Sequence, residues 1–383
     1  MTRACCALLL LLAPCAAMSW GCERITHSGD FETVAVKAFH GACNECPNTG
    51  EDLRRPPCPV ASDAPDLSEM FVYVFKEYRL GFDKTLWTGP DAAAFNLGID
   101  LDCSTRPDGG RPALCEPRTL PDGSGGEPWV ALPHGIDNAF SQRLFAPLYD
   151  KAVKLGGDVN LQQGINDQIA AGKGGVMVVV EHWNGTADDP RVSARIVSVA
   201  GVSDANGGPP RWDGNDLWDA LSDGPDPASP LGAPNTTFKS DDAYVADGKL
   251  VLDLSSQGVA DTTVVNNGAR LDMPIRDFLV MGDLSHDDLL NISVSGRWAY
   301  SDMVRAKVDV ANFLSGCEPA ARAFVLAVWP NLVEVAPDLP IGHDATPGEP
   351  CEAISIGYGG NAIRAGIGGY RPVSALPGGC PTE

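Results

Sequence analysis

The sequence contains few basic residues and, apart from its N-terminus, no long hydrophobic run. Lys and Arg total 28 against 50 Asp and Glu, so the formal net charge is −22 at pH 7. A surface this acidic repels phosphate backbones and anionic lipid headgroups. The longest later apolar stretches, Gly174–Val180 and Ala323–Ala336, are short or interrupted by Pro330 and Glu334, whereas a membrane-spanning helix needs about 20 apolar residues. The sequence therefore predicts no nucleic-acid partner and no transmembrane helix in the mature chain.

Motifs of common enzyme classes are also missing. The sequence has no GxSxG, no HExxH and no Walker-type loop. Gly282–Asp287 (GDLSHD) places Ser, His and Asp side by side, but adjacent side chains in a loop cannot line up as a catalytic triad. Paired carboxylates can hydrolyse glycosides, and 50 acidic residues make some pair inevitable. The sequence favours a binding or structural protein, and a secreted glycoside hydrolase-like enzyme with paired carboxylates is the alternative.

Residues 1–22 have the pattern of a secretory signal. Arg3 precedes a short apolar segment with five consecutive leucines, and a positive charge before such a segment directs export. Three processing sites compete: cleavage after Ala17, lipidation at Cys15 and lipidation at Cys22. Eight cysteines follow Cys22, so its lipidation leaves an even number for pairing. We therefore predict a lipid on Cys22 that anchors the exported chain to the outer membrane or cell surface; a soluble secreted or periplasmic protein is the alternative.

The remaining cysteines are expected to form disulfides, because an oxidising compartment favours them over zinc binding. Cys103 and Cys115 enclose a short Gly/Pro/Asp loop and are predicted to pair with each other. The other six form an early and a late group of three, so complete pairing requires a bridge between the two ends of the chain. These six are Cys43, Cys46, Cys58, Cys317, Cys351 and Cys380.

The composition indicates strands joined by ordered loops. The chain has 42 Gly, 31 Pro and 36 Asp against 14 Glu, and Asp favours turns and caps whereas Glu favours helices. Alternating apolar residues or β-branched and aromatic runs predict strands. The expected strands are Phe71–Phe75, Phe95–Leu101, Gly175–His182, Arg191–Val199, Lys249–Leu254, Arg270–Met281, Leu289–Trp298 and Ala353–Tyr358.

Helical spacing is less frequent. It predicts helices at Asp137–Leu155, Asp158–Ala171, Ser301–Leu314 and Glu318–Leu332, and loops at Asp204–Asn235 and Pro337–Pro350. A cysteine- and proline-rich tether is expected at residues 23–68. Residues 69–383 are predicted to form a single, mainly β domain, a large β-sandwich of jelly-roll type with a few inserted helices. Two stacked domains divided near Asp204–Asn235 are the alternative.

Several short motifs are similar to those of a known group of proteins. They are Phe95–Cys103 (FNLGIDLDC) with the Gly/Pro-rich cysteine loop after it, Pro128–Trp129, Gly135–Asn138, Val179–Asp189 (VVEHWNGTADD), Trp212–Gly214 and Cys351–Gly357. In these motifs the chain resembles uncharacterised cell-surface lipoproteins of the myxobacterial (deltaproteobacterial) type. The resemblance implies lipidation and a surface location, and it says nothing about chemistry. Ser19 and Trp20, shortly before Cys22, depart from a typical lipidation signal.

A calcium site is the sharpest functional hypothesis. Asp100 and Asp102 lie at the end of an expected strand, and Asp137 and Asn138 are expected to return to the same edge. Calcium takes six to eight oxygen ligands from such groups, and it relieves the repulsion between neighbouring carboxylates. In the alternative interpretation these residues cap helices and turns. No segment has the EF-hand spacing.

A second candidate site is the segment in which two tryptophans flank acidic and amide residues. Trp212 and Trp218 enclose Asp213 and Asn215, a mixture that can stack on sugar rings and bind their hydroxyl groups. The segment predicts a ligand site for a glycan, and another surface protein is the other candidate partner. Core packing is the competing interpretation, and the general burial of aromatic side chains favours it.

Overall fold

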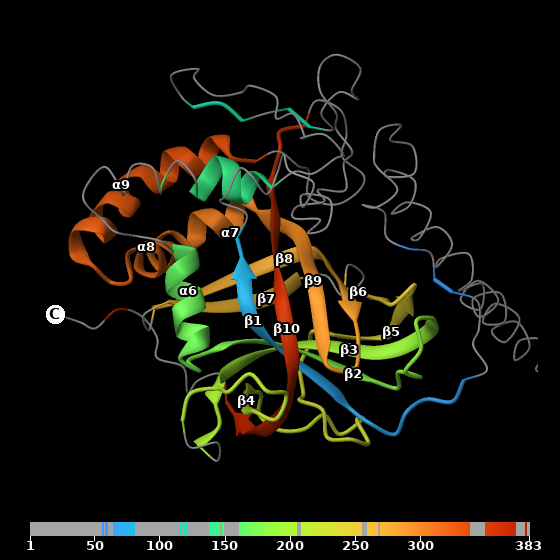
Figure 1. Ribbon diagram of the computed structural model, residues 1–383. Helices are drawn as coiled ribbons and strands as arrows, with labels where there is room; N and C mark the ends of the chain where they lie inside the picture. The colour runs from blue at the N-terminus through green and yellow to red at the C-terminus, as the bar shows by residue number, and fades with distance from the viewer. Residues whose placement is uncertain are drawn as a thin grey trace, which may run out of the picture. The chain divides into compact units, whose positions relative to one another are not determined.

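The computed structural model describes residues 56, 58–59, 64–80, 115–116, 118–120, 138–145, 148, 161–204, 208–254, 259–266, 269–337, 349–372 and 380. The chain divides into two compact units, Met1–Pro47 and Asn48–Glu383, and all described residues belong to the second. This unit is mainly β with a group of helices beside the strands (Figure 1). The prediction of a mainly β, sandwich-like fold is confirmed.

Eight strands form a closed ring in which every neighbouring pair is antiparallel. In ring order they are β1 (Phe71–Arg79), β2 (Gly175–Glu181), β3 (Asp189–Val202), β5 (Lys239–Ala246), β6 (Lys249–Asp253), β8 (Ala269–Leu284), β9 (Asp288–Ala299) and β10 (Ala353–Arg371). The pairing of β10 with β1 closes the ring. A further strand, β7 (Val259–Asn266), extends the sheet by pairing with β8.

A short strand, β4 (Leu217–Leu221), closes a second ring. It pairs antiparallel with the end of β3 and parallel with the end of β10. The strands β1, β2, β3, β4 and β10 therefore form a smaller ring that shares four strands with the larger one. The two rings explain why β3 and β10 are long: each continues past the partners that it has in the larger ring.

Each ring encloses its own hydrophobic core, and the strand alternation assigns side chains to one or the other. In β1, Phe71, Tyr73 and Phe75 belong to the large core, whereas Val72 and Val74 belong to the small core. Because successive side chains point to opposite faces of a strand, an uninterrupted apolar run is expected where both faces are covered. The FVYVF sequence of β1 is such a run, and all five of its residues are buried.

The helices lie together on one side of the strands (Figure 1). They are η3 (Phe140–Phe145), a π-helical turn, and α6 (Leu161–Ala170), α7 (Tyr300–Arg305), α8 (Lys307–Ser315) and α9 (Pro319–Val335). Trp329 of α9 is fully buried, packs against Trp298 of β9 and donates a hydrogen bond to the carbonyl of Met303. Glu318 caps α9 through a bond from the amide of Ala321.

Most expected elements are present, with different limits. The expected strands within β1, β2, β3, β6, β8, β9 and β10 form, although β10 extends to Arg371. The helix expected at Ser301–Leu314 forms as two consecutive helices, α7 and α8, which Ala306 separates. The loop expected at Asp204–Asn235 is wrong at Leu217–Leu221, because these residues form β4. Strands that precede and follow this segment in the sequence belong to the same sheet. The expected strand Phe95–Leu101 lies outside the described residues.

Among the described residues, two disulfides link segments that are distant in the sequence, Cys115–Cys351 and Cys317–Cys380. The predicted pairing of Cys115 with Cys103 is therefore wrong. Backbone hydrogen bonds place Cys115 beside Cys351. The amide of Glu116 donates to the carbonyl of Glu349, and the carbonyl of Glu116 accepts from the amide of Cys351. The partner of Cys115 is thus set by this contact between separate segments and not by the short sequence distance to Cys103.

The other cysteines are less fully described. The thiol of Cys58 lies 3.5 Å from the carbonyl oxygen of Pro190. Cys22, Cys43, Cys46 and Cys103 lie outside the described residues. Of the helices that the structure describes, none is both long and apolar enough to span a membrane.

Candidate binding pocket

The face of β2 and β3 that covers the small core changes from apolar to charged along its length. On β3, Val199 and Val197 belong to the small core, and the next side chain on that face is Arg195. On β2, Val179 belongs to the same core and is followed on that face by Glu181. Both charged residues are nevertheless buried. A set of paired charges therefore continues the small core where its apolar residues end.

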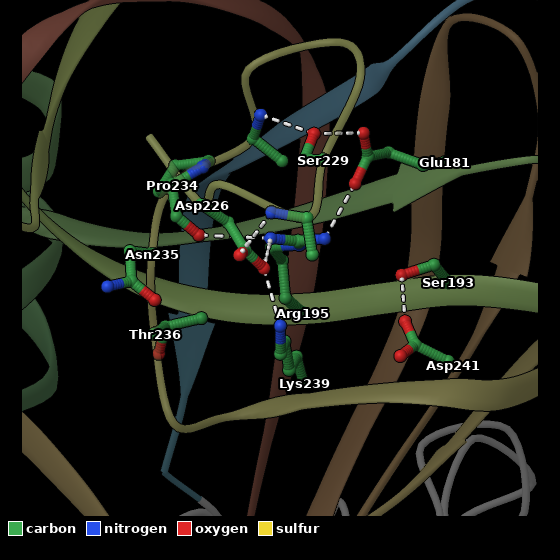
Figure 2. A network of polar contacts seen from close by, with 12 residues as sticks. Glu181, Ser193, Arg195, Asp226, Ser229, Pro234, Asn235, Thr236, Lys239 and Asp241 are labelled. Carbon is green, nitrogen blue, oxygen red and sulfur yellow. Dashed lines mark hydrogen bonds and ion pairs between the residues drawn. The ribbon is translucent and has the colours of Figure 1, made fainter. Parts of the chain in front are cut away.

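Arg195 is the centre of this set (Figure 2). Its Nη2 lies 2.6 Å from Oε2 of Glu181, and its Nη1 lies 3.1 Å from Oδ2 of Asp226. The exposed fractions of the three side chains are 3%, 1% and 6%. Nη1 also donates to the carbonyl of Pro234. Ions this deeply buried persist only when they are paired and hydrogen-bonded, and here the pairs hold a loop against the sheet.

That loop, residues 222–236, is attached at two further points. Ser229 Oγ donates to Oε1 of Glu181 at 2.5 Å and accepts a bond from the amide of Ala233. Asp226 accepts from Nζ of Lys239 at 2.5 Å and from the amide of Ala228 at 3.0 Å. These two bonds, the one from Lys239 foremost, hold the pKa of Asp226 at about 2, below its ordinary value of 3.8. Asp226 is therefore ionised at neutral pH.

The loop and the strands enclose a pocket of about 420 Å³, here called the Arg195 pocket. Its lining is Asp66, Glu181, His182, Arg191, Val192, Ser193, Arg195, Asp226, Ala228, Ser229, Lys239 and Asp241. The volume lies in the range of about 300–1,000 Å³ that small-molecule sites occupy. Among the described residues, no Phe, Tyr or Trp side chain is part of this lining. The pocket can therefore bind a small ligand mainly through polar contacts.

The outer wall of the pocket is more exposed than its floor. Ser193 Oγ donates to Oδ1 of Asp241 at 2.8 Å, and the side chain of Arg191 is 72% exposed. At the opposite margin, Nδ1 of His182 lies 3.7 Å from Oδ2 of Asp66. His182 has a φ of 64°, which is uncommon for residues other than glycine. In the outer wall, Asp66, His182, Arg191 and Asp241 are thus exposed to solvent, whereas Ser193 is buried.

The predicted metal ligands are only partly covered by the structure. Asp100, Asp102 and Asp137 lie outside the described residues. Asn138 is fully buried; its Nδ2 donates to the carbonyl of Gly357 at 2.6 Å and its Oδ1 accepts from the amide of Ser141 at 3.1 Å. Asn138 thus connects η3 to β10. In the part of the chain that the structure describes, no three His, Cys, Asp or Glu side chains are placed to hold a metal ion.

The predicted tryptophan site lies apart from the Arg195 pocket lining. Trp218 is fully buried in the small core, and the half-buried ring of Trp212 lies 5.5 Å from it. Asp213 and Asn215 bond to each other's backbone, since Oδ1 of Asp213 accepts from the amide of Asn215 and Nδ2 of Asn215 donates to the carbonyl of Asp213. The acidic and amide groups here stabilise a turn, and Trp218 fills a core position.

Sequence reasoning did not identify the pocket residues. One signal was present, because Arg191, Ser193 and Arg195 alternate with the apolar Val192 and Ala194 on β3. The partners of Arg195 could not be found from spacing, since Glu181 is on another strand and Asp226 is in a loop. No protein-family model, curated protein or solved structure matches this chain.

Proposed function

We propose that the protein is exported, is anchored through a lipid on Cys22 to the outer membrane or cell surface, and binds a small polar ligand in the Arg195 pocket. The observation that carries the binding proposal is the arrangement of the pocket floor. Glu181, Arg195 and Asp226 are buried and bonded to one another and to the loop. A floor held in this way keeps its shape before a ligand arrives, and such preorganisation reduces the ordering cost of binding.

Export is supported by covalent structure and by sequence. Disulfides form and persist mainly in oxidising compartments, and Cys115–Cys351 joins residues that are 236 positions apart. The signal pattern of residues 1–22 and the resemblance to surface lipoproteins support a lipid on Cys22. Mass spectrometry of the native N-terminus tests this part: a diacylated Cys22 is expected, and a chain cleaved after Ala17 without lipid would refute the anchor.

The hydrolase alternative has no specific observation in its favour. A glycosidase needs one carboxylic acid with a raised pKa as general acid. In the pocket floor both Glu181 and Asp226 are paired with Arg195, and the pKa of Asp226 is lowered to about 2. These carboxylates hold the loop in place, which suits a binding site better than acid–base catalysis.

Binding can be tested on the mature protein by thermal unfolding in the presence of small polar compounds. A ligand that binds the native state raises the melting temperature. The set should include saccharides, amino acids, inorganic anions and divalent cations. We expect at least one class to raise the melting temperature of the wild type but not that of Asp241→Asn. Asp223→Asn is the matched control, because Asp223 is an exposed carboxylate that does not line the pocket. A panel without any such shift would count against a binding function.

We also propose calcium as a stabilising ligand at Asp100, Asp102 and Asp137, with Asn138 next to Asp137 in the sequence. A hard cation reduces the repulsion between such closely spaced carboxylates. Millimolar calcium should raise the melting temperature of the wild type, and a chelator should reverse the shift. Asp102→Asn should reduce the calcium effect, whereas Asp223→Asn should leave it unchanged. An identical melting temperature with calcium and with chelator would end this proposal.

A further inference from the structure

The Arg195 pocket has two tiers of side chains with different charge balances. The inner tier comprises two carboxylates and two cations, Glu181, Asp226, Arg195 and Lys239, and is neutral overall. Every ionised group in it is paired with another member of the tier (Figure 2). A ligand that displaced any of these pairs would leave a buried charge without its partner, which is costly. A ligand should therefore contact the inner tier without breaking the ion pairs within it.

The outer tier faces the ligand more directly. It consists of Asp66, His182, Arg191, Ser193 and Asp241, and it has one net negative charge when His182 is neutral. An ionised carboxylate offers about four lone-pair sites, so Asp241 can accept further bonds besides the one from Ser193. Arg191 supplies donors at the same wall. The outer tier thus presents acceptors and donors in close alternation.

This distribution of charge excludes two ligand classes. Phosphate and other compact anions would meet the carboxylates of Asp66 and Asp241 in a chain whose net charge is already −22. A bare divalent cation needs six to eight oxygens around it, and here Arg191 and Lys239 stand among the acceptors. A hydroxyl group has neither difficulty, because it donates to a carboxylate and accepts from a guanidinium or ammonium group.

We infer that the Arg195 pocket binds a short saccharide without negative charge, whose hydroxyl groups bond to Asp241, Ser193 and Arg191. This inference rests on the proposed binding function and names its ligand class. The volume of about 420 Å³ lies near the lower end of the range for small-molecule sites, which suits one or two sugar rings. Because no Phe, Tyr or Trp ring is part of the lining that the structure describes, directional hydrogen bonds provide the selectivity in place of stacking on a large ring.

Isothermal titration calorimetry on the mature, disulfide-bonded protein tests the inference. The probes are the methyl glycosides of glucose, galactose and mannose, the uronic acid with the configuration of the best binder, glycine, inorganic phosphate and calcium chloride. At least one neutral glycoside should bind, and its uronic acid should bind at least tenfold more weakly. Asp241→Asn and Ser193→Ala should each weaken saccharide binding about tenfold, whereas Asp223→Asn should have no effect. Circular dichroism of each variant verifies that the protein is folded, and Ser193→Ala provides the test if Asp241→Asn does not fold.

The outcomes separate this inference from the proposed function. Binding of glycine, phosphate or the uronic acid in preference to neutral glycosides, with loss in Asp241→Asn, would overturn the ligand class and leave the pocket as a binding site. Saccharide binding that neither variant weakens would place the ligand elsewhere and overturn the inference. If no probe binds, or if calcium alone binds and Asp241→Asn does not weaken it, the inference and the proposed binding function of the pocket both fail.

Discussion

Nη2 of Arg195 and Oε2 of Glu181 lie 2.6 Å apart in an ion pair whose side chains are almost entirely shielded from solvent. The two residues are on neighbouring strands, β3 and β2. Beyond the pair, Asp226 and Ser229 bring the loop of residues 222–236 to the same place. Both residues of this buried pair therefore also bind the loop, and residues of that loop line the pocket. Loss of the pair should affect both stability and binding.

Arg195→Met should destabilise the protein strongly. The substitution leaves Glu181 buried without its cation and removes one of the two cations paired with Asp226, and breaking a buried pair in this way costs about 3–5 kcal/mol. Urea denaturation followed by tryptophan fluorescence measures the change in the free energy of unfolding. Arg191→Met is the matched control: its side chain is 72% exposed, so we expect a change within about 0.5 kcal/mol. Equal losses for the two variants would show that the buried network does not stabilise the fold.

Stability should depend on the ionisation of Asp226 at acid pH. Its folded-state pKa, about 2, lies below the ordinary value of 3.8, because Lys239 and the amide of Ala228 bond to the carboxylate. Between these values the unfolded chain binds more protons at this residue than the folded chain does. The contribution of Asp226 is therefore complete above about pH 5 and is lost as the pH falls through the unfolded value of 3.8 towards the folded value of about 2.

The comparison of wild type with Asp226→Asn isolates this contribution from those of the other carboxylates. Between pH 4 and pH 2 the free energy of unfolding should fall more steeply with decreasing pH for the wild type than for Asp226→Asn. The difference in slope corresponds to at most about one additional proton bound on unfolding. Asp223→Asn, in the same loop, should retain the slope of the wild type. Parallel curves for wild type and Asp226→Asn would contradict the lowered pKa.

Much of the strand pattern could be predicted, because β-branched and aromatic residues concentrate where a strand has two covered faces. FVYVF in β1 and the alternation within β3 are examples. The end of β10 was not predictable in this way, since its glycines disfavour strands on propensity alone. They are needed because the chains pass closely there: a Cβ on Gly360 would collide with the carbonyl of Glu77, and one on Gly368 with Ser203.

The short strand β4 and the pocket depend on tertiary contacts that no local pattern contains. Leu217–Leu221 becomes a strand because it fits between the ends of β3 and β10. Arg195 is 14 residues from Glu181 and 31 from Asp226, so a search for adjacent motifs does not bring the three together. The predicted tryptophan site was more conspicuous in the sequence, yet Trp218 lies inside the small core.

Trp218→Ala should lower stability, because the ring is fully buried among the side chains of the small core. Removing a large buried aromatic side chain costs about 3–5 kcal/mol. Trp212, which is half-buried beside it, is the matched comparison, and Trp212→Ala should cost markedly less. Chemical denaturation of both variants provides the measurement. A folded Trp218→Ala protein with unchanged stability and reduced glycan binding would instead favour a ligand role for this residue.

The covalent link between Cys115 and Cys351 predicts a definite peptide map. Proteolysis of the native protein without reduction should release one linked species that contains both cysteines and a second that contains Cys317 and Cys380. The first link holds Glu116 beside Cys351, where the backbones of the two residues are hydrogen-bonded. Cys351→Ser should therefore lower the free energy of unfolding by about 2–5 kcal/mol, the usual effect of losing a native disulfide. Reduction of the wild type should cost at least as much, since it breaks this bond and the Cys317–Cys380 bond as well. A peptide joining Cys103 to Cys115 would contradict the arrangement, because Cys115 cannot form both bonds at once.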